Sequence, residues 1–321
     1  MGANNVATTN GDVWKRQRKL INPVFHRAMP VKTFGRVMPR LFDRIDENPL
    51  KSPMAVLVKS FTLDVLGLAI FAFDFKSLLG DPEGWTKTYE TIMDHLFDPW
   101  MTIFAKIEPI LQAVIPSRRR SYQAVQKFNG MILALAEKRR EEILEGKDVY
   151  TPDQEKDLMT LLIQVGMEQG IHTTNEELRE NLCAFFLAGH DTTGNALTFC
   201  LYNLAKHKHV QDKLRNEIIS VMGDTGEDRI PTMDQLKQMP YLNLVIKENL
   251  RHCGPTDRLM DRVANKDIVL NGITIPKGTT LNVDVTSIHM NPEYWQDPEK
   301  FMPERFEDHA NPSTIAYLPF G

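Results

Sequence analysis

The chain has 321 residues, of which 42% are hydrophobic and 25% charged, so its composition is that of an ordinary globular protein rather than a disordered one. Its formal net charge of −4 gives no overall basic field for neutralising phosphates, and we expect no nucleic-acid partner. The three cysteines lack the paired spacing of a zinc site or a secreted disulfide framework, which fits a reducing compartment.

The beginning of the chain shows no targeting signal and no anchor. Met1 to Asp12 is polar and lacks the apolar stretch of a signal peptide. The longest apolar run, Val65 to Phe73, is far too short to span a bilayer. We therefore expect a soluble or peripheral chain, without internal repeats or a composition shift that would mark a second domain.

The first predicted helix carries Trp14 and Arg18 on one face, at i and i+4. Both side chains can donate hydrogen bonds to a carboxylate, although a tryptophan packed against an arginine stem is the commoner explanation for this pattern. Lys15, Arg16 and Lys19 turn toward the other face, where a docking patch for an acidic partner and a merely solvated helix side are about equally supported.

From Asp12 to about His252 the pattern predicts mostly helix, with apolar residues at three- and four-residue spacing. The segment from Phe61 to Phe71 is apolar nearly all round, which is typical of a buried helix. The basic runs 118–120 and 138–140 favour solvated helix faces. The histidines show no metal-ligand spacing, and we expect no metal site formed by this chain's own side chains.

A long helix is predicted to begin near Thr174, whose hydroxyl and the side chain of Glu177 form a capping box. Further along this helix, Ala188 and Gly189 remove side-chain bulk at one turn, and Asp191 and Thr192 follow. A hydroxyl beside a carboxylate can relay protons into a site without admitting bulk water. Taken alone, the segment fits a helix-packing notch and a functional groove equally well.

Glu248 and Arg251 lie one helical turn apart in a strongly apolar helix, so we expect the pair to be at least partly buried. A buried pair needs a further partner, and Arg305 in the proline-rich tail has a planar guanidinium that can pin this tail to the helix. We favour a structural over a catalytic role for these three residues, because arginine does not act as an acid or base near neutral pH.

The chain ends in a β-hairpin and an irregular tail. Residues 268–275 place Asn271-Gly272 between β-branched runs, which predicts a tight hairpin. From Asn291 onward, four prolines prevent long regular elements and predict a meandering loop.

Three motifs stand in this order along the chain: the Ala188 to Thr193 segment, Glu248 to Arg251, and Phe301 to Phe306. In sequence and spacing they resemble the cytochrome P-450 superfamily of haem-thiolate monooxygenases. The resemblance implies a partial cytochrome P-450 fold, mainly α with a small β-hairpin or sheet region. It also implies one incomplete domain over residues 1–321, with a helical part at 1–255 and a hairpin and meander at 256–321.

The resemblance assigns roles to the candidate residues. Asp191 and Thr192 would relay protons, and Ala188 and Gly189 would border the oxygen pocket. Trp14, Arg18 and Arg262 would hold the haem propionates, and Phe320 would lie against the cofactor, while the Glu248, Arg251 and Arg305 triad locks the meander. The iron-ligating cysteine is expected after Gly321, and the family's first helices, small sheet and membrane anchor before Met1. The segment after Arg251, His252-Cys253-Gly254-Pro255, departs from the family's usual proline pair and leaves the placement of Arg262 uncertain by a residue.

The implied cofactor is haem b with its iron, and NADPH and flavins enter only through a separate flavoprotein reductase, which would dock on Lys15, Arg16 and Lys19. The implied reaction inserts one atom of dioxygen into a small apolar organic substrate. The full-length parent would lie at the endoplasmic reticulum membrane, on its cytosolic face. Two rivals stay open: a non-catalytic truncated product that binds haem or partners, and an unrelated helical scaffold with accidental motifs. Because its axial ligand would be missing, we expect the chain alone to give no thiolate-type haem spectrum.

Overall fold

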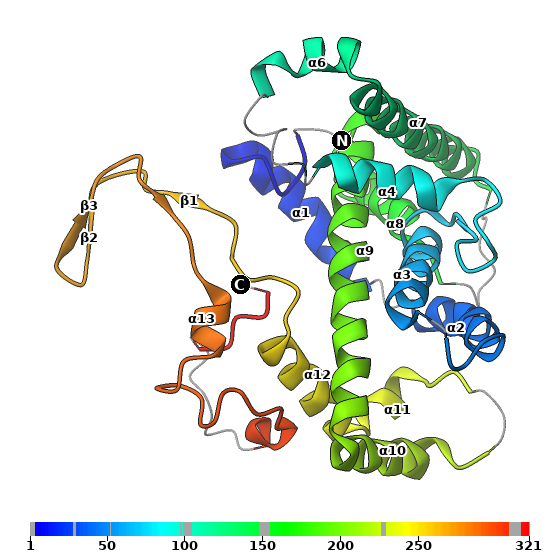
Figure 1. The fold of residues 1–321 in the computed structure, drawn as a ribbon. Coiled ribbons are helices and arrows are strands. Elements are labelled where there is room, and N and C mark those ends of the chain that lie inside the picture. Colours follow the sequence, from blue (N-terminus) through cyan, green and yellow to red (C-terminus); the bar gives the residue numbers. More distant parts are fainter. Residues whose placement is uncertain are drawn as a thin grey trace. The chain divides into compact units, whose positions relative to one another are not determined.

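The computed structural model describes most of the chain as two compact units. The first unit extends to Asp191 and the second begins at Thr192, so the boundary lies inside one continuous helix, α9 (Asn175–Lys206). Figure 1 shows the elements of both units. The described residues are 4–27, 30–51, 53–96, 98, 105–147, 155–225, 229–307 and 316–320.

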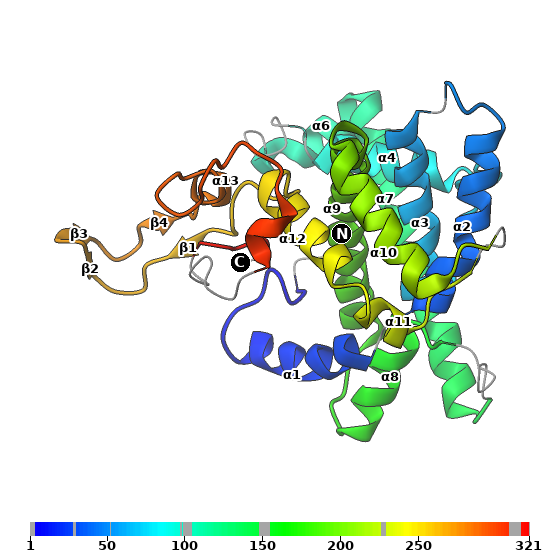
Figure 2. The same cartoon turned by 90° about the horizontal axis from the view of Figure 1, so that it is seen from below.

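The first unit is built from helices. Its elements before α9 are α1 (Gly11–Arg27), α2 (Val31–Asp46), α3 (Met54–Phe71), α4 (Trp85–Leu96), the 3-10 turn η1 (Ala105–Ile107), α6 (Glu108–Val114), α7 (Pro116–Leu144) and α8 (Leu158–Glu168). Helix α4 packs on α7, α2 on α3, and α1 on α8, the last pair being clear in Figure 2.

An aromatic cluster lies at the centre of the first unit. Phe186 of α9 is fully buried, and its ring centroid lies 5.3 to 5.4 Å from those of Phe71, Phe75, Tyr89 and Phe128. Tilted and edge-on contacts at this spacing are favourable beyond the area that they bury. The cluster therefore ties α3, α4 and α7 to the first half of α9.

Helix α3 is long and apolar enough to cross a membrane by length and composition, and no other helix of the described chain meets both criteria. The uninterrupted apolar run Val65 to Phe73 gave too short a length for this apolar helix, because polar residues such as Asp64 interrupt its apolar sequence. More than half of α3 is buried inside the unit, and the Asp64 carboxylate accepts hydrogen bonds from the backbone N–H groups of Ser77 and Leu78 at 2.7 and 3.0 Å. The contacts of α3 are those of a core helix.

The second unit combines helices with two short antiparallel strand pairs. After α9 come α10 (Lys208–Met222), α11 (Met233–Lys237), α12 (Pro240–His252), β1 (Arg262–Val263), β2 (Ile268–Leu270), β3 (Ile273–Ile275), β4 (Thr280–Leu281), α13 (Val285–His289) and the 3-10 turn η2 (Pro303–Phe306). Strand β1 pairs with β4, and β2 with β3. Its core joins α10 and α12 to the tail through Val210, Val245 and Phe301.

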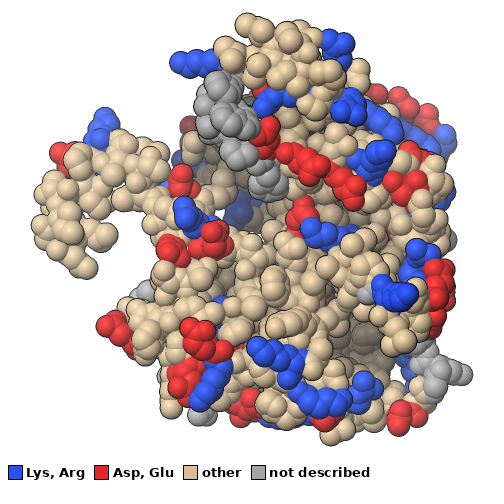
Figure 3. All heavy atoms as spheres, in the orientation of Figure 1, with Lys and Arg blue, Asp and Glu red and all other residues tan. Residues whose placement is uncertain are grey.

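The hairpin β2–β3 turns at Asn271 and Gly272, whose φ angles are +48° and +78°. Two successive positive φ angles fit a type I′ turn, which matches the twist of the flanking strands. Val269, Leu270 and Ile273 are 61 to 70% exposed on this hairpin. In the space-filling view, most of the surface of the segment that holds β2 and β3 is uncharged (Figure 3).

Several expectations from the sequence are confirmed. The fold is mainly α with a small antiparallel region, α12 ends at His252, and the hairpin falls on the predicted residues. The capping box also forms, because Glu177 N donates to Thr174 Oγ1 at 3.1 Å and Thr174 N donates to Glu177 Oε2 at 3.3 Å.

The interpretation of residues 118–120 as a solvated face is wrong for Arg118. This side chain is 8% exposed and forms ion pairs with Glu108 and, at 3.0 Å, with Asp98. Charge spacing along one helix could not reveal these partners, because they come from α6 and from the residues after α4. A buried carboxylate requires a cation, and Arg118 supplies it.

Candidate functional site

The candidate site on α9 begins with two small residues that have different surroundings. Ala188 is exposed, whereas Gly189 faces the side chain of Leu66 on α3. A Cβ atom placed on Gly189 would lie 3.3 and 3.4 Å from the two methyl carbons of Leu66. At Gly189 the structure therefore favours the helix-packing interpretation, while the surface of Ala188 stays open.

Asp191 lies at the centre of a polar cluster that connects three helices of the first unit. Lys59 of α3 places Nζ 3.4 Å from its Oδ1, and the Tyr89 hydroxyl of α4 donates to Oδ2 at 3.3 Å. The ring of His190 is 5% exposed, with Nε2 3.0 Å from the carbonyl oxygen of Lys59 and Nδ1 3.7 Å from Asp191 Oδ1. Two possible cations and one hydroxyl thus surround a single carboxylate.

This environment determines the charge state of the cluster. The neighbouring His190 ring, followed by Lys59, favours the ionised form and lowers the pKa of Asp191 below its ordinary value, against the opposing effect of partial burial. Burial, and then the charge of Asp191, raise the pKa of Tyr89 well above its ordinary value. At neutral pH Asp191 is therefore an ionised acceptor, and Tyr89 is a protonated donor.

A hollow of about 250 Å³ gives access to this cluster. Lys59, Tyr89, His190 and Asp191 line it, and the exposed Asp94 belongs to its wall. The sequence carried no signal for Lys59 and Tyr89, which are 132 and 102 positions from Asp191. His190 stands inside the motif, but only metal spacing was considered for it. The Asp191 carboxylate is partly exposed to this hollow, whereas His190, which also lines it, is buried.

The second unit encloses a fully buried carboxylate, Glu248 of α12. Arg251 donates to both of its oxygens, from Nε at 2.8 Å and from Nη2 at 2.9 Å. Arg305 Nε and the backbone N–H of Met302 donate to Oε1 at 3.1 and 2.9 Å. The exposed fractions of Glu248, Arg251 and Arg305 are 0%, 2% and 8%. The three side chains that the sequence analysis grouped thus meet in the interior of this unit.

Backbone carbonyls of the tail accept the remaining donors of the two arginines. Arg251 donates to the carbonyl oxygens of His289 and Pro298 at 2.8 and 2.9 Å. Arg305 donates to those of Gln296 and Lys300 at 2.9 and 3.1 Å. Two guanidinium groups around one carboxylate leave a net positive charge, which these carbonyl dipoles offset. The arrangement fixes residues 289–305 on α12.

His289 connects the end of the described chain to this cluster. Its Nε2 accepts a hydrogen bond from the backbone N–H of Leu318 at 2.9 Å, and the Tyr317 hydroxyl donates to the carbonyl oxygen of Lys247 at 3.2 Å. Burial, followed by the charge of Arg251, lowers the pKa of His289 and keeps the ring neutral, as an acceptor must be. Phe320, two residues further on, is 84% exposed.

On α1 the structure brings Trp14 and Arg18 together, with the guanidinium carbon 5.9 Å from the indole centroid. Both side chains are exposed.

The three cations on this helix differ in their surroundings. Lys15 pairs with Asp12 at 3.2 Å, and Arg16 forms an ion pair with Glu177 at the start of α9. Lys19 has no ion-pair partner among the described residues, so it is the most available cation of the three.

Arg262 lies on β1 in the second unit, exposed and paired across the strands with Leu281. The three thiols form no disulfide and differ in their surroundings. Cys183 is 1% exposed, donates to Asn129 Oδ1 at 3.5 Å, and its pKa is raised by burial to about 11. Cys200 packs against the core of the second unit, and Cys253 Sγ lies 3.3 Å from Nδ1 of the adjacent His252. Among the described residues no cluster of His, Cys, Asp or Glu has the geometry of a metal site.

Comparison of the sequence with known proteins identifies a family. The sequence profile of the family described as Cytochrome P450 matches residues 2–321. Protein LUTEIN DEFICIENT 5, chloroplastic, from Arabidopsis thaliana is 30% identical over 97% of this chain and 53% of its own length. Human Cytochrome P450 3A7 is 28% identical over 99% of this chain and 64% of its own length, and rat Cytochrome P450 4F5 is 28% identical over 97% and 62%.

The match extends along the whole chain, which itself spans 53 to 64% of the length of these relatives. It includes the α9 segment around Asp191, the Glu248 carboxylate with its two arginines, and the proline-rich tail. Cytochromes P450 are haem-containing monooxygenases that receive electrons from a separate reductase. This chain belongs to the cytochrome P450 family.

Proposed function

We propose that this chain forms the central part of a haem-dependent monooxygenase, which inserts one atom of dioxygen into a small apolar organic substrate. The electrons would come from NADPH through the flavins of a separate reductase. Family membership supports the reaction class, and the ionised Asp191 in its solvent-accessible cluster supports the proton chemistry that this class requires. This cluster is the observation that carries the proposal.

Each of the two units offers exposed donors that would suit a haem carboxylate. Trp14 and Arg18 present an indole N–H and a guanidinium side by side, and Arg262 presents a third donor from β1. Neither arginine has an ion-pair partner among the described residues, so both are available to propionates. Haem, when bound, supplies the iron at which dioxygen is activated. Ala188 and Phe320 would offer exposed apolar surface to the ring, whereas Gly189 would act by letting α9 approach α3.

The role of Asp191 is to bring protons from solvent to the next residue, Thr192. Its carboxylate is ionised, so it can take up a proton that hydronium delivers through the hollow, leaving water behind, while Lys59 and Tyr89 hold the carboxylate in place. The proton then passes to the hydroxyl of Thr192, which would donate it toward the oxygen site. The ring of His190, which is 5% exposed beside the carboxylate, would limit the entry of further water.

The test is substitution of Asp191 in the enzyme that contains this chain. Asp191→Asn removes the acceptor but keeps the size of the side chain, and we expect product formation to fall about 100-fold, the range for loss of a general acid-base group. Haem content should be unchanged, and the solvent isotope effect on turnover should rise. Asp94→Asn is the matched control, since Asp94 lines the same hollow but is exposed. Equal turnover in both variants would refute the assignment.

Docking and location follow from the same family membership. Lys15, Arg16 and Lys19 are proposed to meet the acidic reductase, with Lys19 contributing most because the other two form ion pairs. We propose the cytosolic face of the endoplasmic reticulum for the parent enzyme. One of the relatives is designated chloroplastic.

A second function, binding of haem or partner proteins without turnover, has one observation in its favour. Cys183 is buried and Cys200 packs against the core, so neither is presented as an iron ligand, while Cys253 Sγ contacts His252 Nδ1. The transcript beyond the codon for Gly321 separates the two functions. A glycine-rich loop with a cysteine there supports the monooxygenase, and a stop codon supports the binding protein.

A further inference from the structure

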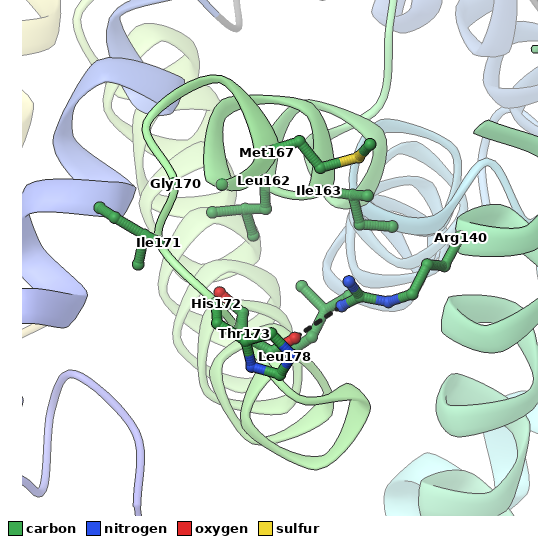
Figure 4. Close-up of a pocket in the computed structure, with 10 residues that line it drawn as sticks. Arg140, Leu162, Ile163, Met167, Gly170, Ile171, His172, Thr173 and Leu178 are labelled. Carbon is green, nitrogen blue, oxygen red and sulfur yellow. Dashed lines mark hydrogen bonds between the residues drawn. The ribbon is translucent and has the colours of Figure 1, made fainter. Parts of the chain in front are cut away.

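A second hollow of the first unit lies apart from Asp191 and belongs to no element of the proposed chemistry. It has a volume of about 240 Å³ and opens between α7, α8, the turn that follows α8, and the start of α9 (Figure 4). Its floor is formed by side chains of the main core, Leu162, Ile163 and Leu178, which are 2 to 4% exposed. Met167 and Ile171 complete an apolar wall nearer the solvent.

The end of α8 creates this hollow. Gly170 has φ +64°, its N–H donates to the carbonyl of Met167 at 3.2 Å, and Ile171 N donates to Gly166 O at 2.9 Å. These two bonds form a Schellman motif, which turns the chain sharply back over the helix end. Gly166 has no side chain to fill the space below, where an added Cβ would approach Ile171 O and Thr173 Oγ1 at 3.3 and 3.8 Å. The opening is therefore built into the backbone.

A cation lies at the edge of the apolar wall. Arg140 reaches in from α7, and its Nη2 donates to the carbonyl of Thr173 at 2.8 Å (Figure 4). Its Nε donates to Asn175 Oδ1 at 2.7 Å. Both acceptors are uncharged. Among the described residues Arg140 has no ion-pair partner and Nη1 has no hydrogen bond, whereas the neighbouring Lys138 faces Glu142 at 3.9 Å. The guanidinium is thus held in place with its charge unpaired.

Thr173, which lines the hollow, carries a second polar group. Thr173 Oγ1 is buried and has no hydrogen-bond partner in the described structure. A buried hydroxyl without a partner is costly, and a ligand that accepts its hydrogen bond would relieve this cost. One hydroxyl donor and one unpaired guanidinium at the edge of an apolar hollow are complementary to a carboxylate that carries a hydrocarbon chain.

We propose that this hollow binds a small amphiphilic carboxylate, with the chain against Leu162, Ile163 and Leu178 and the carboxylate on Arg140 and Thr173. The apolar floor disfavours a phosphate or a nucleotide, whose polar surface would lose its hydration there. A neutral hydrocarbon would fill the hollow but leave both polar groups unsatisfied. The site is separate from the oxygen chemistry and does not depend on it.

Octanoate is a suitable probe, and its binding to the 321-residue chain is measured by calorimetry. The neutral analogue octanol has a similar chain without the charge, and we expect it to bind about tenfold more weakly. Arg140→Gln should weaken octanoate about tenfold and leave octanol unchanged. Lys138→Gln is the matched control, because it removes a cation from the same helix at a residue that does not line the hollow. Methyl resonances of Ile163 and Ile171 should shift with octanoate in the wild type.

Thr173→Val keeps the shape of the side chain and removes the hydroxyl, so we expect about fivefold weaker octanoate binding. This variant and the comparison of octanoate with octanol decide the matter even if Arg140→Gln unfolds. The proposal is overturned if octanoate shows no saturable binding, if octanol binds equally well, or if Thr173→Val leaves the affinity unchanged. None of these results depends on haem or turnover.

Discussion

The stability of the second unit depends on single residues, and Glu248 is the clearest case. Its carboxylate is the common acceptor for Arg251, Arg305 and the N–H of Met302, and all of it is buried. Removing one partner from a buried ion cluster leaves uncompensated charge, which costs far more than the net contribution of the intact cluster. The folded conformation of residues 289–305 therefore depends on the side chain of Glu248.

We predict that Glu248→Gln destabilises the second unit by about 3 to 5 kcal/mol. The amide keeps the shape of the side chain, but it leaves two buried guanidinium groups without their anion. Hydrogen exchange of the backbone amides at 298–305 should rise strongly. Glu299 is an exposed carboxylate on the same loop. Glu299→Gln should leave the free energy of unfolding within about 0.5 kcal/mol of the wild type and the exchange of these amides little changed. Similar exchange in the two variants would show that the loop does not depend on the triad.

His289 makes the same unit sensitive to pH. Folding lowers its pKa from the ordinary 6.5, so the unfolded chain takes up the proton first as the pH falls. The stabilisation is complete above pH 6.5 and is lost below it, with a slope of up to about 1.4 kcal/mol per pH unit. His289→Gln should remove this slope and still accept the hydrogen bond from Leu318. The exposed His209→Gln should retain it, as measured by urea unfolding between pH 5 and 8.

At the scale of elements, helix glycines differ in what surrounds them. A Cβ on Gly67 of α3 would lie 2.4 Å from a ring carbon of Phe75 and 2.5 Å from the carbonyl oxygen of Phe73. Gly130 of α7 has nothing within 4 Å of the same position. The first glycine allows the chain to fold back on its helix, whereas the second has no such role.

We therefore predict opposite effects for alanine at these two positions. Gly67→Ala should destabilise the first unit by about 1 to 3 kcal/mol or more, because a backbone oxygen cannot move aside as a side chain can. Gly130→Ala should stabilise it by about 0.5 to 1 kcal/mol, since alanine favours the helix and meets no neighbour. Urea unfolding of both variants gives the comparison, and a neutral Gly67→Ala would contradict the packing seen around α3.

Local sequence predicted elements better than it predicted partners. The capping box at Thr174, the hairpin turn at Asn271 and the end of α12 depend on residues a few positions apart, and all three form. The short helix α13 and the polar cluster around Asp191 were missed. The cluster joins three helices, and no spacing rule links Lys59 or Tyr89 to a carboxylate more than a hundred positions away.

The spacing of charged residues also overestimated how many of their side chains lack a partner within the chain. For Arg16 a docking patch and a solvated helix side were equally supported, yet it pairs with Glu177, a residue recognised only as part of the capping box. Arg140 was expected on a solvated face, but it is half-buried and holds the turn after α8. A charge pattern shows which side chains share a helix face. It does not show which other element will cover that face.

At the scale of the whole molecule, each compact unit has its own core. The clusters around Phe186 and Val37 lie entirely in the first unit, and the cluster around Val245 lies entirely in the second. Helix α9 continues through the boundary at Asp191, so the backbone links the units, while the buried apolar contacts of each cluster stay within one of them. Separate cores favour separate cooperative transitions.

We predict that calorimetry of the 321-residue chain resolves two transitions that respond to different substitutions. Gly67→Ala should lower only the transition of the first unit, and Glu248→Gln only that of the second, by about 2 to 4 °C per kcal/mol for units of this size. The exposed substitutions Gly130→Ala and Glu299→Gln serve as controls and should not lower either transition. A single transition lowered by both Gly67→Ala and Glu248→Gln would mean that α9 transmits stability across the boundary, so that the two cores unfold together.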